Sequence, residues 1–358
     1  MALCRKIALI DLDRSHIDTF PVSVDDRDRF LGGSGFATYL LCRYAPKKYQ
    51  PRSAKSVCVI SAGLLGGTLS APQGYTILTT KSGSTGLMTR SCLEGPFATE
   101  MRQAGFDHLV FKGRAERPTY LFVHDGQIEP VEAPDFAEKR PIERRKILRD
   151  ATAGRETRLL YIKKEREDQF FLADDSFSPD FESESSGVGA ALADKNIEAV
   201  ACRGTLDIEV KDPEAVIAFE KNYHTRNADN KTPWRDSEGV TINGPAGKVE
   251  LMEIEKTVQQ CLGLPFETNG DTTASDFGII SARIRLNTGK SLNENDLKNI
   301  AYRCITLERL YNIREGITEK EGRTAEKYQQ YGWTRKAVVK KKVFDALRIG
   351  DLWAQLKD

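Results

Sequence analysis

The chain has 358 residues, of which 40% are hydrophobic and 8% aromatic, so it is long enough for two domains and has enough apolar side chains for a packed core. A formal net charge of +1 gives no electrostatic reason to expect nucleic acid or an anionic membrane as a partner, and no apolar run reaches the roughly 18 residues of a membrane-spanning helix. The seven cysteines are scattered and include no CxxC pair, which favours reduced thiols in the cytoplasm over a disulfide framework.

The start of the chain predicts strands and one helix. Residues 6–12 are rich in apolar side chains and soon meet an Asp, which indicates a strand and not a signal peptide. Residues 17–24 are the expected hairpin partner of this strand, and 57–62 form a buried strand. Between them, the glycines at 32–35 lead into a predicted helix at 36–41.

Residues 63–113 are the most distinctive stretch, because Gly, Ser and Thr crowd its first half. Glycines permit close backbone approach, and hydroxyls with free amides offer hydrogen bonds to a polar or phosphorylated ligand. The second half predicts a short helix at 96–104, ended by Gly105, and a buried strand at 109–111. The stretch indicates a loop-rich sheet with a ligand face. The alternative is a β-rich domain with glycine turns and no ligand, and composition alone favours it.

The middle of the chain continues the mixed pattern. Asp125-Gly126 predicts the turn of a hairpin over 118–131. The segment 174–186 is acidic and hydroxyl-rich, which is typical of a loop. The remaining predicted strands lie at 159–162, 197–203 and 207–210, and the remaining helices of this half lie at 142–151, 187–193 and 212–226.

A polar segment at 227–248, rich in Gly, Pro and Asp, is interpreted as a linker. It would separate a first domain at 1–226 from a helical part at 249–358. Apolar residues at helical spacing predict helices at 249–262 and 294–311. A basic amphipathic helical region is expected at 336–356, with its lysine run on a solvated face.

Several motifs follow one another along the chain. They are Leu31-Gly32-Gly33-Ser34-Gly35, the run 62–68, Thr79-Thr80-Lys81-Ser82, Ala104-Gly105-Phe106-Asp107, the run 112–120, Gly187-Val188-Gly189-Ala190, Arg203-Gly204-Thr205 and the run 308–316. Their order resembles the aldehyde:ferredoxin oxidoreductase family, the tungsten- or molybdenum-pterin enzymes. The resemblance covers roughly 1–220 and continues in fragments over 250–355. It implies an α+β fold, with a β-sheet base on which pterin lies in active members and a smaller helical part after it.

The iron–sulfur ligands of the family are missing from the sequence. Catalytic members are much longer and hold a [4Fe–4S] centre, which needs four thiolates. The family motif Asp-x-x-Gly-Leu-Cys, which carries the last of these ligands, reads Gln260-Cys261-Leu262-Gly263-Leu264-Pro265 here. Gln replaces the Asp that contacts pterin and Pro replaces the ligand Cys, so no cluster is expected within this chain.

The pterin phosphate site also departs from the family. Tyr75, Cys92 and Ser185 align with a family Arg, Asn and Arg, and neither Tyr nor Ser can replace a guanidinium clamp. Arg90 or Arg102 could compensate, and Cys92 could be a ligand or a reactive thiol. No catalytic residue or metal ligand is assigned. The candidate cofactor-binding residues on the family motifs are Tyr75, Lys81, Ser82, Cys92, Ser185, Gly187 and Gly189.

The other polar residues are interpreted as structural or surface residues and not as catalytic ones. The four histidines flank no carboxylate pattern and are interpreted as structural or surface residues. Glu308 and Arg309 are expected to form a structural ion pair.

Three functions remain open. The first is a non-catalytic subunit that acts as a scaffold in a larger redox complex, bound to a second copy or to a full-length metal-bearing relative, with no cofactor. The second is an aldehyde-type oxidoreductase that keeps a tungsten or molybdenum pterin and takes its iron–sulfur cluster from a partner. The third is a pterin or small-molecule binding protein. An open apolar face near 63–113 would favour assembly, unless residues 227–358 fold back and cover it.

Overall fold

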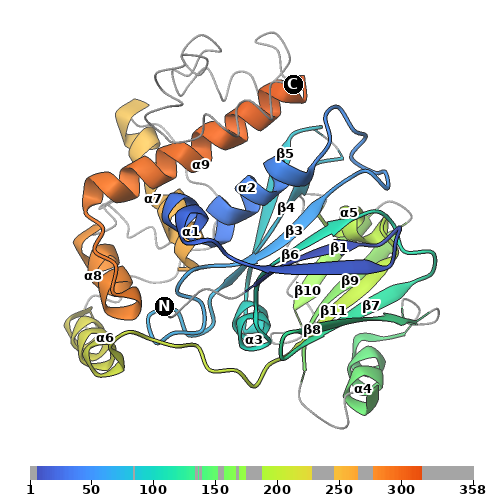
Figure 1. Cartoon of the computed structure of the whole chain (residues 1–358), viewed down its shortest axis with the longest axis horizontal. Helices are drawn as coiled ribbons and strands as arrows, with labels where there is room; N and C mark the ends of the chain where they lie inside the picture. The colour runs from blue at the N-terminus through green and yellow to red at the C-terminus, as the bar shows by residue number, and fades with distance from the viewer. Residues whose placement is uncertain are drawn as a thin grey trace.

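The computed structural model describes residues 6–83, 85–133, 136, 139–151, 157–166, 169–174, 188–227, 246–264 and 277–316. These residues form an α+β fold built on two mixed sheets (Figure 1). Within this part of the chain, no helix is long and apolar enough to cross a bilayer.

The first sheet has six strands in the order β2-β1-β6-β3-β4-β5, and its pairs are antiparallel except for β1 with β6. The strand β3 is buried along its whole length and β6 along nearly all of it, which explains their near-continuous apolar runs. The strands are β1 (Lys6–Asp11), β2 (His16–Pro21), β3 (Cys58–Ala62), β4 (Tyr75–Lys81), β5 (Met88–Glu94) and β6 (Phe106–Lys112).

The second sheet has five strands in the order β10-β9-β11-β7-β8. Asp125 and Gly126, both at positive φ, form the predicted tight turn between β7 and β8. The strands are β7 (Thr119–His124), β8 (Gln127–Glu132), β9 (Arg158–Arg166), β10 (Gln169–Asp174) and β11 (Ile197–Arg203).

Helices cover one face of the first sheet and lie between the two sheets. The helices α2, α7 and α9 share a core with one face of the first sheet, and α3 and α5 lie in the core between the two sheets. The helices are α1 (Val24–Phe30), α2 (Gly33–Tyr44), α3 (Phe97–Gln103), α4 (Pro141–Ala151), α5 (Val188–Ala193), α6 (Pro213–Asn227), α7 (Ala246–Leu262), α8 (Phe277–Thr288) and α9 (Glu294–Arg314).

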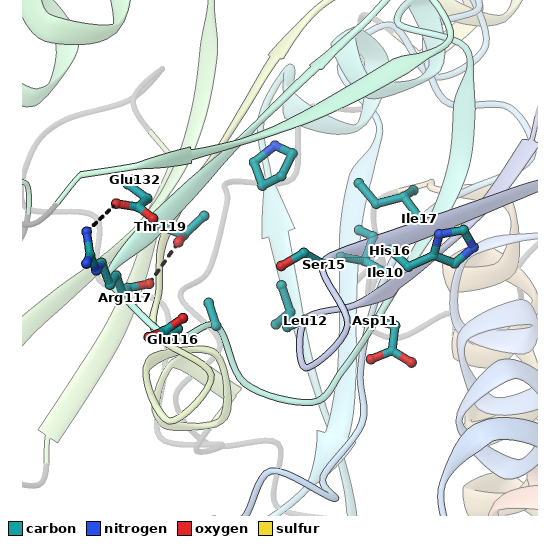
Figure 2. A pocket seen from close by; sticks show the side chains of 12 residues that line it. Ile10, Asp11, Leu12, Ser15, His16, Ile17, Glu116, Arg117, Thr119 and Glu132 are labelled. Atoms are coloured by element: carbon teal, nitrogen blue, oxygen red, sulfur yellow. Dashed lines mark hydrogen bonds and ion pairs between the residues drawn. The ribbon is translucent and has the colours of Figure 1, made fainter.

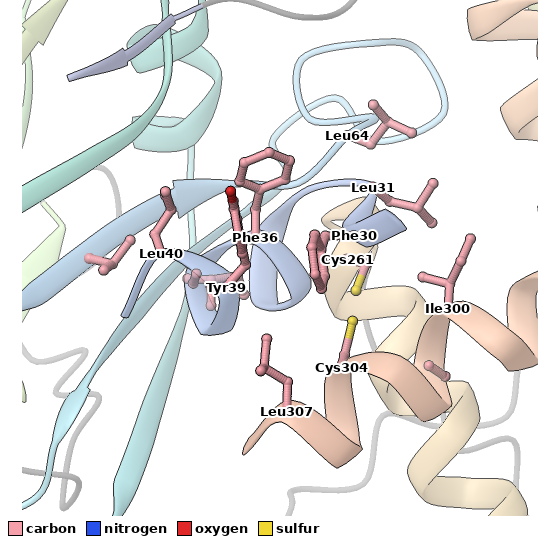
Figure 3. Packing of buried hydrophobic residues seen from close by; sticks show 14 of the residues in the cluster. Phe30, Leu31, Phe36, Tyr39, Leu40, Leu64, Cys261, Ile300, Cys304 and Leu307 are labelled. Atoms are coloured by element: carbon pink, nitrogen blue, oxygen red, sulfur yellow. The ribbon is translucent and has the colours of Figure 1, made fainter. Parts of the chain in front are cut away.

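The largest core corrects the expectation of an open apolar face. Phe36 and Leu40 of α2, Val258 of α7, and Leu307 and Leu310 of α9 pack in one cluster on the first sheet (Figure 3). Residues after the expected linker fold back and cover this face, which was the alternative to an open face. Because both sides of the linker contribute to this core, the boundary at 227–248 stays a proposal.

Two local predictions differ from the structure, and some elements were not predicted. Residues 207–210 form no strand. The hairpin partner predicted at 17–24 ends at Pro21, because the Ser23 side chain accepts a hydrogen bond from the Asp26 amide and caps α1. β10 and α8 were not predicted at all, and the helix expected at 336–356 lies outside the described residues.

Candidate functional site

The candidate face is the side of the first sheet that α2, α7 and α9 cover, together with the loop 63–68. The register of β4 with β5 pairs Ile77 with Cys92 and Thr79 with Arg90. Since paired residues of an antiparallel sheet point to the same side, these four side chains share the face on which Ile77 joins the helical core. The face thus combines a glycine-rich loop, a thiol and a guanidinium group.

The amides of the loop 63–68 are bonded within the chain. The N–H groups of Leu64 and Leu65 donate to the carbonyl oxygens of Cys261 and Leu262, at 3.1 and 2.9 Å. These carbonyls end α7, where the last turn of a helix leaves acceptors without an intrahelical partner. The amides of residues 66, 67 and 68 donate to other carbonyls of the same turn at 2.9 to 3.1 Å. The loop that was expected to offer amides to a ligand uses them to close on α7.

Glycine is required at two points of this closure. A Cβ atom at Gly63 would lie 2.1 Å from the backbone nitrogen of Gly263. Gly33, at φ +44°, begins α2, and a Cβ atom there would lie 2.0 Å from the carbonyl oxygen of Gln260. The glycines of the family motifs therefore allow the N-terminal loops to touch the end of α7.

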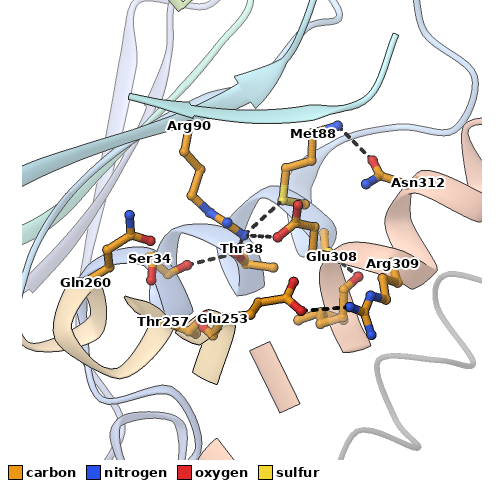
Figure 4. Close-up of polar contacts among 12 residues, drawn as sticks. Ser34, Thr38, Met88, Arg90, Glu253, Thr257, Gln260, Glu308, Arg309 and Asn312 are labelled. Atoms are coloured by element: carbon orange, nitrogen blue, oxygen red, sulfur yellow. Dashed lines mark hydrogen bonds and ion pairs between the residues drawn. The ribbon is translucent and has the colours of Figure 1, made fainter. Parts of the chain in front are cut away.

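The two arginines that could have clamped a phosphate are engaged inside the protein. Arg90 donates to the Glu308 carboxylate at 2.5 Å and to the Thr38 hydroxyl at 2.9 Å (Figure 4). Arg102 is buried, donates to the Asp107 carboxylate at 3.0 Å and reaches two carbonyl oxygens of the loop 63–68. The first arginine ties β5 to α9, and the second supports the loop from the opposite side.

A charged cluster forms where β5, α7 and α9 meet, and we define it as Arg90, Glu308, Arg309 and Glu253 (Figure 4). Arg309 donates to the Glu253 carboxylate at 3.0 Å, and burial raises the pKa of Glu253. Glu308 and Arg309 do form ion pairs, but with different elements. Glu308 pairs with Arg90 of β5, and Arg309 pairs with Glu253 of α7. Two guanidinium and two carboxylate groups cancel in formal charge, so the cluster offers no net attraction for an anionic phosphate.

Lys81 and Ser82, two of the predicted cofactor residues, take structural roles. The Lys81 ammonium donates to the Tyr49 carbonyl and the Glu315 carboxylate, both at 2.7 Å, and both charged side chains are nearly inaccessible to solvent. The Ser82 amide donates to the Leu87 carbonyl at 2.7 Å in the turn that links β4 and β5.

Tyr75 and Cys92 lie at the candidate face. Tyr75 begins β4 and packs against the helical core. Cys92 is half-buried, and its sulfur accepts a hydrogen bond from the Gln260 amide group at 3.2 Å. Burial raises the pKa of Cys92, so the thiol is protonated at neutral pH, whereas a metal ligand or nucleophile is a thiolate.

Gly189 is separated from these residues. It lies in the first turn of α5, whose Val188 and Leu192 pack in the core between the two sheets, on the other side of the first sheet. Ser185 and Gly187 lie outside the described residues. Across the residues that the structure describes, no group of three or more His, Cys, Asp or Glu side chains is arranged to hold a metal ion.

A separate hollow lies between the β1–β2 hairpin and the strands β7 and β8 (Figure 2). Its rim carries Arg117 paired with Glu132 at 3.0 Å, both largely exposed, and the exposed His16. None of the predicted cofactor residues that the structure describes lines it. Its charges are mixed in sign, and Arg117 is held by Glu132, so we assign no chemistry to it.

Sequence reasoning missed the partners that the last third of the described chain brings to the candidate face. Gln260, Glu308 and the thiol pair of Cys261 and Cys304 lie on α7 and α9, far in sequence from β4 and β5. The helical patterns at 249–262 and 294–311 predicted these two helices. They did not show that the helices pack on the first sheet.

Comparison with known proteins agrees with the motif order. The family model "Aldehyde ferredoxin oxidoreductase, N-terminal domain" matches residues 7–204. The tungsten-containing aldehyde ferredoxin oxidoreductase of Pyrococcus furiosus is 30% identical over 223 residues, which cover 60% of this chain and 36% of the relative. An "Aliphatic sulfonate oxidoreductase, WOR-like subunit" of the same organism is 27% identical over 234 residues, covering 61% and 37%. The chain spans about a third of the length of these relatives.

A solved structure, the active site complex BamBC of benzoyl coenzyme A reductase with 1,5-dienoyl-CoA, shares the fold. The alignment has a TM-score of 0.79 at 14% sequence identity and covers 98% of this chain and 97% of the other. This likeness supports the fold alone. The family match over residues 7–204, more than half of the chain, shows that this protein belongs to the aldehyde ferredoxin oxidoreductase family.

Proposed function

We propose that this chain is a non-catalytic member of the family, which acts as a scaffold or partner subunit in a larger redox complex and holds no tungsten- or molybdenum-pterin. One observation carries the proposal. The end of α7 binds the amides of Leu64 and Leu65, so the loop that the resemblance assigns to the cofactor is closed by the chain itself.

The chemistry of the face supports the same conclusion. A pterin phosphate needs donors and positive charge. Here Arg90 and Arg102 are held by carboxylates, and Lys81 is held by Glu315. The Cys92 thiol is protonated at neutral pH, as its raised pKa requires. The described residues of this face do not fit the cofactor in this arrangement, and we derive no reaction from it.

The proposed partner role rests on the descriptions of two similar proteins. One relative is named a subunit, and the structural neighbour is part of a complex between two different chains. The proposed partner is a second copy of this chain or a full-length relative that carries the metal, with contact through surfaces other than the face that α2, α7 and α9 cover.

The deciding experiment is metal and pterin analysis of the protein purified from its native source, with all co-purifying chains identified. We expect tungsten or molybdenum only in fractions that contain a second, metal-bearing chain, and none in this chain after the two are separated. Pterin released in a one-to-one ratio from the separated chain would contradict the proposal and favour an aldehyde-type oxidoreductase subunit.

Sedimentation of the purified chain tests the partner role by itself. We expect either a self-associated species or a complex recovered from the native lysate. A clean monomer of 40.0 kDa at micromolar concentration, with no partner recovered, would contradict the scaffold role and favour a small-molecule binding protein.

A further inference from the structure

Two buried thiols face each other where α7 and α9 pack. Cys261 is the penultimate residue of α7 and Cys304 lies in the middle of α9, and both are reduced and inaccessible to solvent (Figure 3). Each sulfur lies 2.9 Å from the position that a Cβ atom at Gly35 would take, so the two sulfurs are close neighbours. Gly35 therefore leaves the space that both sulfurs occupy.

The surroundings make the two thiols unequal. The Ser34 hydroxyl lies 3.5 Å from the sulfur of Cys261, in a hydrogen bond that either group can donate, and Ser34 belongs to the first turn of α2. A hydroxyl donor and a helix N-terminus stabilise a thiolate. The neighbouring Cys304 thiol lowers the pKa of Cys261, and Cys261 in turn raises the pKa of Cys304.

Cys42 and Cys92 have different surroundings. Burial raises the pKa of Cys42 to about 12, and its sulfur faces the Leu307 carbonyl. The pKa of Cys92 is also raised by burial. The nucleophilic and the resolving roles of a dithiol are thus both present in one pair.

We propose that Cys261 and Cys304 form a redox-active pair, which a hydroperoxide oxidises to a disulfide that fixes α7 to α9. The thiolate of Cys261 attacks the peroxide oxygen, the O–O bond breaks, and a sulfenic acid and hydroxide form. The Cys304 sulfur then attacks the sulfenic sulfur, its proton leaves with the displaced hydroxide as water, and the S–S bond forms. Two thiols and one hydrogen peroxide thus give one disulfide and two waters.

The disulfide would act on the candidate face through the backbone. The carbonyls of Cys261 and Leu262 hold the amides of Leu64 and Leu65, so a covalent link at Cys261 restrains the element that closes the loop 63–68. In the reduced protein, hydrogen bonds hold the loop 63–68 closed. Under oxidising conditions, the disulfide would add a covalent restraint that keeps it closed. This inference does not rest on the scaffold role, because the chemistry of the two thiols needs no partner and no cofactor.

The first test is chemical. The reduced full chain is exposed to hydrogen peroxide, free thiols are blocked, and the protein is digested without reductant for mass spectrometry. We expect a peptide pair linked through Cys261 and Cys304. In Cys304→Ser, and in Cys304→Ala as a second variant without a buried hydroxyl, the link is lost and dimedone traps a sulfenic acid at Cys261.

Cys42→Ser is the matched control, because Cys42 is equally buried but faces a carbonyl. It should form the link at the wild-type rate. Oxidation of Cys92 before any change at Cys261 would overturn the proposal. So would conversion of Cys261 to sulfinic acid in the wild-type chain without a link to Cys304.

The second test follows the loop. Amide hydrogen exchange at Leu64 and Leu65 should slow by at least about tenfold in the oxidised wild-type protein, since a disulfide opposes the opening of α7. Peroxide-treated Cys304→Ala should exchange like the reduced protein. Unchanged exchange at both amides in the linked protein would refute control of the loop by the pair, and the metal and pterin analysis would be unaffected by that result.

Discussion

Gly63→Ala is the substitution that tests closure of the loop 63–68 most directly. The new Cβ atom would lie 2.1 Å from the Gly263 nitrogen and 2.4 Å from the Leu262 carbonyl carbon. Both are backbone atoms, well inside the roughly 3.5–4.0 Å of ordinary contact between heavy atoms. The end of α7 must therefore move away from the loop, because no flexible side chain is available to yield.

The cost follows from what that movement breaks. The amides of Leu64 and Leu65 lose their carbonyl partners on α7, at about 1 kcal/mol each. Overpacking at the contact adds about 1–3 kcal/mol. The φ of Gly63 is outside the left-handed region, so alanine suffers no backbone strain and regains about 0.5 kcal/mol from the unfolded chain. We expect the free energy of unfolding to fall by about 2.5–4.5 kcal/mol.

Urea denaturation of Gly63→Ala measures this loss, with Gly83→Ala as the matched control. A Cβ atom at Gly83 would meet nothing closer than 3.9 Å, so its effect should stay within about 0.5 kcal/mol. If Gly63→Ala were as stable as Gly83→Ala, α7 would not be seated on the loop. The loop would then be open to a ligand, and the argument for a closed cofactor face would fail.

Two further predictions concern buried titratable groups. Burial lowers the pKa of His108 to about 4. As the pH falls, the unfolded chain, in which a histidine has its ordinary pKa of about 6.5, therefore binds a proton before the folded chain does. The free energy of unfolding should fall by about 3 kcal/mol between about pH 6.5 and 4. Urea denaturation at several pH values should show a flatter curve for His108→Asn in that window, and parallel curves would contradict the assignment. Lys81→Met leaves the Glu315 carboxylate with the Arg314 guanidinium, at 2.8 Å, as its charged partner, and should cost about 1.5–3 kcal/mol, whereas Lys81→Met combined with Glu315→Leu should cost more, because Arg314 then loses its carboxylate. A loss below about 1 kcal/mol in the single variant would show that this ion pair is not desolvated.

Local chemistry made several elements readable from the sequence. The continuous apolar runs of β3 and β6 predict buried strands, and Asp125-Gly126 predicts a turn, because each depends on neighbouring residues only. Gly105, at φ +97°, follows α3 where a helix end favours glycine. The order of the family motifs likewise identified the family and the α+β fold without coordinates.

Alternating side chains misled the prediction at 207–210, for a tertiary reason. Ile208 of this segment packs on a loop and not in a sheet, because it fills the space beside Gly67. Periodicity records which side chains are buried, but it does not say whether a strand or a loop surface buries them.

The candidate face was decided by contacts between distant segments. Arg90 meets Glu308 across 218 positions of sequence, and Cys92 meets Gln260 across 168. The sequence determined that a glycine-rich loop and two amphipathic helices exist. Only the tertiary structure decided that α7 ends on the loop, because Gly63 and Gly263 let two backbones touch at a point that no local pattern encodes.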